Sequence, residues 1–169
     1  MTNKNKNARS NGLNIAFIAI PVLLIVIIGA LVLNGGILGE SSGANVVKDS
    51  DLVIKLDEVT ETAKFYPVVM GGTKLEVLAV KAPDGTIRTA FNTCQVCYAS
   101  GRGYYKQEGN ELVCQNCGNR FGMDDVEVTR GGCNPVPITE DYKTANDEEI
   151  VISKDFLNEA KIIFSNWKN

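Results

Sequence analysis

The sequence predicts a mainly β domain that carries two metal-binding CxxC knuckles and is preceded by one N-terminal transmembrane helix. Three observations indicate this. An apolar run without charge, residues 15–33, lies near the N-terminus, and short β-rich runs separated by turn signals follow it. Two CxxC pairs, Cys94/Cys97 and Cys114/Cys117, then stand sixteen residues apart. With 169 residues, the chain is long enough for one modest domain and an appendage.

The first 38 residues predict an arm and a membrane span. Residues 1–12 carry three basic residues and no acid, so we expect a cytoplasmic basic arm. About 20 apolar residues can cross a bilayer as a helix, whereas the apolar core of a signal peptide has about 7–15. We therefore expect an uncleaved transmembrane helix over residues 13–38; a long, cleaved signal peptide is the alternative. The positive-inside rule places the N-terminus in the cytoplasm and the C-terminal domain outside the cytoplasmic membrane.

The part of the chain beyond this span is acidic. Fourteen basic and twenty acidic residues from Glu40 onward give it a net charge of −6. Binding of nucleic acid requires a concentrated positive field, so a nucleic-acid partner is excluded. Residues 39–51 are small and polar and predict a flexible tether. Residues 52–169 are then expected to form an extracytoplasmic, cysteine-rich, metal-binding domain.

The segment 52–91 consists of β-rich runs. Its alternation over residues 75–80 places apolar side chains on both faces of one strand. Pro83 presets φ and Gly85 gives a permissive backbone, which together favour a hairpin turn. We expect this hairpin to deliver Cys94 at its end.

Later segments predict a second hairpin, a last strand and a terminal helix. Residues 100–113 indicate a loop and two strands joined by a Glu-Gly-Asn turn, so that each CxxC pair follows a hairpin. Residues 148–153 are strand-like. Ser153 is a candidate N-cap for a helix over residues 153–167. At helical spacing this segment carries the apolar residues Phe156, Leu157, Ala160, Ile163, Phe164 and Trp167.

The spacing of Cys94, Cys97, Cys114 and Cys117 is typical of a four-thiolate metal site. Two intervening residues let both thiolates of a pair turn toward one point, and two such knuckles close an all-sulfur cage. Three interpretations stay open: a structural zinc ribbon, a pair of disulfides, or an iron centre with one iron or a [2Fe–2S] cluster.

The sequence contains no histidine. This excludes a two-Cys, two-His zinc finger, a haem with an axial His, a Ser-His triad and a Rieske centre with its two His ligands. No general base, nucleophile or small-molecule substrate is evident, and no catalytic residue is predicted. An electron-transfer or docking protein therefore fits the sequence better than a free-standing enzyme.

Five motifs between residues 84 and 135 are distinctive: D-G-x-I-R-x-A-F, C-x-V-C-Y, G-Y-Y-x-Q-x-G, V-C-x-N-C-G-x-x-F and G-G-C-N-P. Together they resemble the FtrD-like family of membrane iron–sulfur proteins, and the likeness runs over about residues 52–167. The segment VCQNCGNRF is also similar to the second metal knuckle of Rieske domains. That similarity implies a Rieske-like β fold with an all-sulfur ligand set.

The resemblance implies an iron–sulfur cluster, [2Fe–2S], at Cys94, Cys97, Cys114 and Cys117, with zinc or a single iron as alternatives. Cys133 matches a further family cysteine, and it is a candidate cofactor ligand, a disulfide partner or a packed thiol. The implied function is electron transfer in iron uptake, with an iron permease or another membrane redox partner. The alternative is a zinc-ribbon or disulfide-stapled module that docks a membrane transport partner.

Two features depart from the family pattern. Asn92 and Gln95 stand where many relatives carry Asp. One predicted span also makes a channel formed by this chain alone an unsatisfactory interpretation, so a partner would have to supply the electrons.

Overall fold

The computed structural model describes residues 45–169, which fall within one compact unit. The expected basic arm, the transmembrane helix and the first part of the tether lie outside the described residues. Within residues 45–169, no helix is both long enough and apolar enough to cross a membrane.

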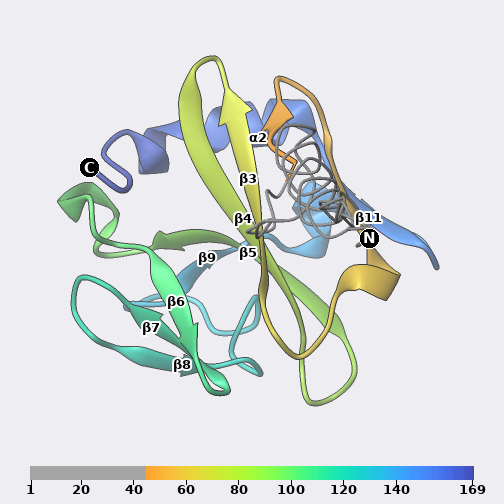
Figure 1. Ribbon diagram of the computed structural model, residues 1–169, viewed down its shortest axis with the longest axis horizontal. Helices are drawn as coiled ribbons and strands as arrows, with labels where there is room; N and C mark the ends of the chain where they lie inside the picture. Colours follow the sequence, from red (N-terminus) through yellow and green to blue (C-terminus); the bar gives the residue numbers. More distant parts are fainter. Residues whose placement is uncertain (1–44) are drawn as a thin grey trace, which may run out of the picture. The chain divides into compact units, whose positions relative to one another are not determined.

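Three β sheets form the framework of the domain (Figure 1). The central sheet has the order β1-β3-β4-β5-β9, with antiparallel pairs except for the parallel pair of β1 and β3. Its strands are β1 (Val47–Lys48), β3 (Lys64–Met70), β4 (Thr73–Lys81), β5 (Ile87–Cys94) and β9 (Pro135–Pro137). The mainly β class predicted from the sequence is confirmed.

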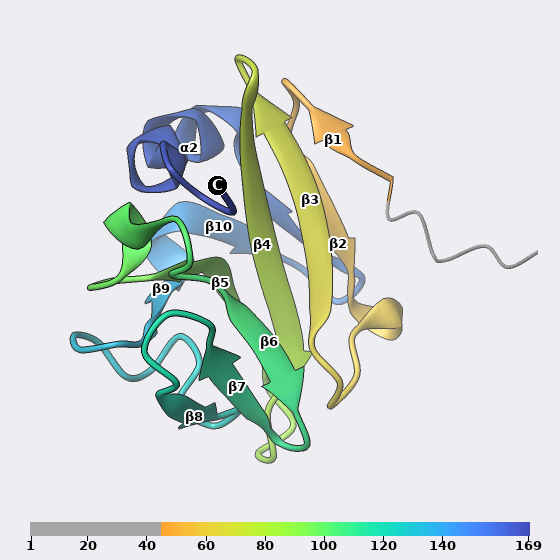
Figure 2. The same cartoon turned by 60° about the vertical axis from the view of Figure 1, so that its left-hand side comes forward.

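Two smaller antiparallel sheets complete the β structure. We call them the back sheet and the knuckle sheet, and Figure 2 shows the knuckle sheet beside β4 and β5. The back sheet contains β10 (Lys143–Ala145), β11 (Glu149–Ile152) and β2 (Leu52–Lys55). The knuckle sheet contains β6 (Tyr105–Glu108), β7 (Glu111–Cys114) and β8 (Arg120–Gly122).

Strand β4 separates two hydrophobic cores. Leu75, Val77 and Ala79 belong to the first core, which the back sheet and the C-terminal helix share. Leu78 and Val80 point to the opposite face and pack in the second core, with the knuckle sheet. The alternation predicted for this strand is therefore confirmed, and both faces of the central sheet are buried. The second core is the one that contains the cysteines.

The hairpin between β4 and β5 forms at the predicted turn. Gly85 has a φ of +84°, and its N–H donates a hydrogen bond of 2.9 Å to the carbonyl of Ala82. The carboxylate of Asp84 accepts a hydrogen bond of 3.0 Å from the N–H of Thr86. Strand β5 then ends at Cys94, as the sequence predicts.

The ordered domain begins before residue 52. Val47 pairs with Val68 in the central sheet, and the Asp49 carboxylate accepts a hydrogen bond of 2.7 Å from the N–H of Gly71. The Asp51 carboxylate accepts one of 2.7 Å from the N–H of Lys154. The last residues of the predicted tether therefore lie against the domain.

The C-terminal segment is a short helix followed by 3₁₀ turns. Ser153 caps helix α2 (Lys154–Glu159), since its Oγ accepts a hydrogen bond of 3.3 Å from the N–H of Phe156. The single long helix that the sequence predicts is wrong beyond Glu159, where the tighter η4 (Ala160–Phe164) takes over. This winding buries Phe164 in the first core and leaves Ile162 exposed. The other 3₁₀ turns are η1 (Leu56–Glu58), η2 (Tyr98–Ser100) and η3 (Glu140–Tyr142).

Candidate metal centre

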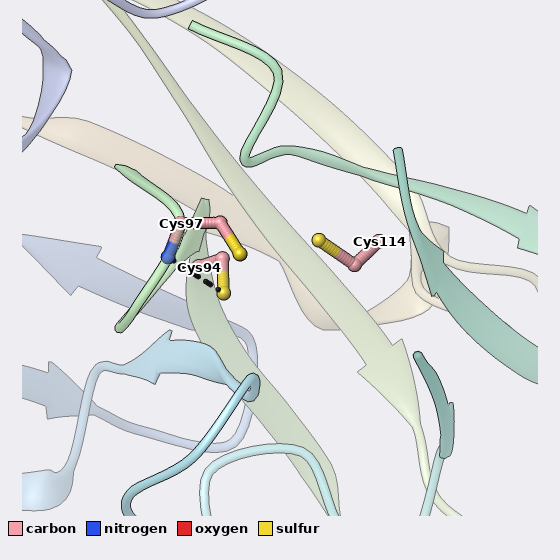
Figure 3. A group of neighbouring side chains, drawn as sticks. All are labelled: Cys94, Cys97 and Cys114. Atoms are coloured by element: carbon pink, nitrogen blue, oxygen red, sulfur yellow. Dashed lines mark hydrogen bonds between the residues drawn. The ribbon is translucent and has the colours of Figure 1, made fainter. Parts of the chain in front are cut away.

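All five cysteines gather on the face of the central sheet that carries the knuckle sheet. Cys94 ends β5 and Cys114 ends β7; Cys97 and Cys117 follow in the adjoining turns, and Cys133 precedes β9. The sulfurs of Cys94, Cys97 and Cys114 lie within 4.8 Å of one another, and Figure 3 shows Cys114 pointing across toward the other two. The sulfurs of Cys97, Cys117 and Cys133 form a second such trio. Cys97 belongs to both.

Cys133 lies between the two knuckles. Its Sγ is 3.2 Å from the Sγ of Cys117 and 3.6 Å from the Sγ of Cys97. A tetrahedral ion with metal–sulfur bonds of about 2.3 Å holds its sulfurs about 3.8 Å apart. The sulfurs therefore stand near the spacing that metal ligation requires, and all five are free thiols.

The first knuckle has a tight backbone. The N–H of Cys97 donates a hydrogen bond of 3.2 Å to the Sγ of Cys94, as Figure 3 shows, and the N–H of Cys94 donates one of 2.7 Å to the carbonyl of Gly103. A Cβ added at Gly103 would collide with the carbonyl oxygen of Cys97. The glycine of the GYY motif is therefore required for close packing against the knuckle.

The second knuckle closes through its own backbone. The N–H of Gly118 donates to the carbonyl of Cys114, and the N–H of Cys114 donates to the carbonyl of Asn119, each over 2.9 Å. Gly118 has a φ of +75°, a conformation that glycine adopts without strain. A glycine directly after the pair therefore lets the backbone turn away from the second knuckle without strain.

Asn92 joins the two knuckles through β6. Its Oδ1 accepts a hydrogen bond of 2.7 Å from the N–H of Tyr105, and its Nδ2 donates one of 3.3 Å to the carbonyl of Tyr105. Tyr105 is paired with Cys114 in the knuckle sheet. The Asn92 Nδ2 also donates to the Glu76 carboxylate over 2.6 Å. An Asp at this position would lose both donated bonds and would face the carboxylate of Glu76. These contacts explain why this chain has Asn at position 92.

Gln95 positions the loop that carries Cys133. Its Oε1 accepts a hydrogen bond of 3.1 Å from the N–H of Gly131, and its Nε2 donates one of 3.2 Å to the carbonyl of Pro135. An Asp has no amide to donate the second bond. The pairing of Cys94 with Pro135 in the central sheet brings the same loop to the first knuckle.

The five thiols differ in their exposure to solvent. Cys94 and Cys114 are buried, Cys97 and Cys133 are half-buried, and Cys117 is exposed. The second core covers the buried side of the group. A centre held here would be shielded from water on one side and close to the surface at Cys117.

The pKa values of the thiols differ strongly from one another. Burial raises the pKa of Cys114 to about 12, and the hydrogen bond with Cys117 raises the pKa of Cys133. The backbone N–H of Asn119 lowers the pKa of Cys117 to about 7. Burial opposes ionisation of Cys94, yet hydrogen bonds to its sulfur, among them the one from the Cys97 N–H, lower its pKa overall. Neighbouring thiolates repel one another, and a bound cation relieves that repulsion.

The donor set fits the group that the sequence predicts. Thiolates are the soft ligands that iron–sulfur clusters and zinc select. Four thiolates complete either a [2Fe–2S] cluster or a tetrahedral ion, so five converging thiols include one that is not needed. Sequence reasoning had no signal for the supporting role of Tyr105, whose hydroxyl donates a hydrogen bond of 2.5 Å to the carbonyl of Cys133.

The chain is similar to a known family over most of its length. A family model described as membrane iron–sulfur containing protein FtrD-like matches residues 59–164, which include all five cysteines. Searches of curated proteins and of solved structures found no match. The likeness of the second knuckle to Rieske domains stays a prediction.

Proposed function

Because the chain belongs to the FtrD-like family of membrane iron–sulfur containing proteins, we propose that it is a membrane-anchored, extracytoplasmic carrier of electrons in iron uptake. The observation that supports this function is the convergence of five free thiols at one site, graded from buried Cys94 and Cys114 to exposed Cys117. A structural centre needs no ligand at the surface, whereas exchange of electrons requires a short path to a partner.

The proposed ligands are Cys94, Cys97, Cys114 and Cys117. A [2Fe–2S] cluster held by four cysteines accepts and releases one electron. The chain contributes the rest of the site. The N–H of Cys97 donates to the Sγ of Cys94, and donation to a ligand sulfur raises the reduction potential of such centres. The buried second core excludes water from one side, and Cys117 marks the side that a partner approaches.

The proposed function also requires that the chain crosses the cytoplasmic membrane once. Residues 13–38 serve as a single span with the N-terminus inside, and residues 39–51 connect the span to the domain outside. The partner is an iron permease or another membrane redox protein. A reporter enzyme that is active only outside the cytoplasmic membrane, fused after Asn169, tests the orientation: an inactive fusion in intact cells contradicts it.

The experiment that tests the centre uses the full chain, purified anaerobically in detergent. We expect visible absorption together with about two irons and two sulfides per chain. Serine substitutions of Cys94, Cys97, Cys114 and Cys117, one at a time, are expected to remove most of the absorption. Val96→Ala is the matched control, since this exposed side chain lies in the first knuckle and is not a thiol.

Other results of the same measurement would identify other centres. One iron without sulfide would indicate a single-iron site. Colourless protein with bound zinc would contradict the electron carrier, because Zn²⁺ has no redox chemistry and no visible colour. It would leave the alternative of a docking module for a membrane transport partner.

A further inference from the structure

Cys133 is the thiol that a four-cysteine centre does not need. Its sulfur nevertheless lies 3.2 Å from that of Cys117, closer than the 3.6 Å that separates it from the sulfur of Cys97. We propose that Cys117 and Cys133 form a peroxide-reactive thiol pair, which closes to a disulfide when the protein lacks its metal.

Access to solvent selects Cys117 as the thiol that reacts with peroxide. It is the exposed cysteine of the five, whereas Cys94 and Cys114 are buried at strand ends. Oxidation of cysteine follows exposure, and sensor thiols stand next to a second thiol that resolves the first product. Cys133 is in that second position.

The sulfur of Cys133 can approach that of Cys117 by rotation of its side chain, since Tyr105 holds only the backbone carbonyl of Cys133. The sulfurs must approach from 3.2 Å to about 2.05 Å. Gly131 and Gly132 precede Cys133, and a Cβ added at either would meet no atom within 4 Å. Cys97 has less freedom, because its N–H is bonded to Cys94 and its carbonyl accepts a hydrogen bond of 2.9 Å from Ser100. The pair Cys117–Cys133 is therefore favoured over Cys97–Cys133.

The reaction has two balanced steps. The Cys117 sulfur attacks one oxygen of hydrogen peroxide, the O–O bond breaks, and a sulfenic acid and one water form. The Cys133 sulfur then attacks the sulfenic sulfur; the S–S bond forms, the S–O bond breaks, and the thiol proton leaves with the hydroxide as a second water. In total, two thiols lose two electrons and one peroxide becomes two waters.

The disulfide has a consequence for the centre. Cys117 is one of the proposed metal ligands, so the oxidised pair cannot hold a metal until a dithiol reductant opens it. The bond also protects Cys117 from irreversible oxidation to sulfinic acid. Formation of the disulfide does not depend on electron transfer by the chain, because it takes place in metal-free protein.

Digestion with trypsin places the cysteines that could form a disulfide with Cys133 in different peptides. Cleavage after Lys and Arg places Cys94 and Cys97 in residues 89–102, Cys114 and Cys117 in residues 107–120, and Cys133 in residues 131–143. The full chain in detergent is stripped of metal with a chelator under reducing conditions, freed of reductant, and treated with one equivalent of hydrogen peroxide. Mass spectrometry of the digest, without reduction, then finds the linked peptides.

We expect residues 107–120 linked to residues 131–143, with fragment ions that assign the bond to Cys117. Cys97→Ser keeps the link, and Cys133→Ser removes it. With one equivalent of peroxide Cys133→Ser leaves Cys117 as a sulfenic acid, and with two or more equivalents it converts Cys117 to sulfinic acid. A link between residues 89–102 and 131–143, a bond at Cys114, or no link to Cys133 in the wild-type chain overturns the proposal. Because the wild-type digest decides the result, a variant that fails to fold does not affect it. The visible absorption of the metal-loaded chain is a separate measurement, so failure of the proposed iron–sulfur centre and failure of the proposed thiol pair can be told apart.

Discussion

The buried Tyr105 hydroxyl on β6 holds the backbone carbonyl of Cys133 through a hydrogen bond of 2.5 Å. The same tyrosine is bonded through its backbone to Asn92 on β5 and is paired with Cys114 on β7. One residue of the knuckle sheet thus links the Cys133 loop to both knuckles. The position of the fifth thiol depends on this contact.

We therefore expect Tyr105→Phe to loosen the Cys133 loop. An unsatisfied buried carbonyl costs about 1–3 kcal/mol, and the Cys133 carbonyl is only half-buried, so the free energy of unfolding in urea should fall by about 1 kcal/mol. Cys133 in metal-free protein should also be alkylated faster, as measured on the peptide 131–143. Tyr104→Phe is the control, since no hydrogen bond of its hydroxyl is found among the described residues. Equal effects of the two variants would contradict the assigned contact.

Gly103→Ala is expected to disrupt the first knuckle. The added methyl would collide with the carbonyl of Cys97, so the turn must shift and the metal content of the purified chain should drop severalfold. Gly109→Ala is the matched control, because its φ is +63° but a Cβ there meets no atom within 4 Å. It should cost about 1 kcal/mol of stability from backbone strain alone and keep the metal. Normal metal content in Gly103→Ala would show that the close approach is not required.

Asn92→Asp should destabilise the junction between β5 and β6. It removes the two bonds that the Asn92 amide donates and sets a new carboxylate against Glu76, at a cost of about 2–3 kcal/mol in the free energy of unfolding. Glu76→Gln in the same chain restores a donor, so the double variant is expected to recover part of the loss. Additive losses in this double-mutant cycle would rule out the direct contact.

The ion pair of Lys143 and Glu127 tests whether burial makes the loss of a charged partner more costly. These side chains are 6% and 15% exposed, and Glu127 also accepts a hydrogen bond of 2.8 Å from the N–H of Thr89. Glu127→Ala leaves a buried charge unpaired and should cost about 3–5 kcal/mol in urea unfolding. Glu149→Ala, which removes the partner of the exposed Lys55, should have a much smaller effect, since solvent screens that pair. Equal losses in the two variants would contradict the role of burial.

The hydrogen bonds in the turn before β5 predict that the stability of the domain depends on pH. Hydrogen bonds from Thr86, and then from Arg88, lower the pKa of Asp84 from its ordinary 3.8 to about 2. A folded-state pKa below the ordinary value means that this carboxylate stabilises the fold above about pH 4, and that the contribution is lost as the pH falls toward 2. The thermal midpoint of the wild-type chain should therefore fall more steeply over this range than that of Asp84→Asn. Parallel curves would contradict the shift.

Much of the domain follows from local sequence. The alternation in β4, the turn at Pro83 and Gly85 and the cap at Ser153 each depend on residues a few positions apart. The spacing of the two CxxC pairs likewise predicts two knuckles, because two intervening residues suffice to turn both thiols toward one point. The family was also recognisable from short motifs, and the family model confirms it.

Other features required contacts between distant parts of the chain. The winding after Glu159 follows the packing of Phe164 rather than its helical spacing. The positions of Asn92 and Gln95 have meaning only once Tyr105 and the Cys133 loop are placed beside them. No periodic pattern encodes such pairs, since each depends on which strands become neighbours.

The sequence by itself determined a mainly β domain, two thiol knuckles and membership of a membrane iron–sulfur family. Only the tertiary structure decided that Cys133 joins the knuckles and that Cys117 is the thiol at the surface. The physical reason is the range of the interactions. Turns and knuckles close within a few residues, whereas the place of Cys133 is set by the pairing of β5 with β9 and by the hydroxyl of Tyr105.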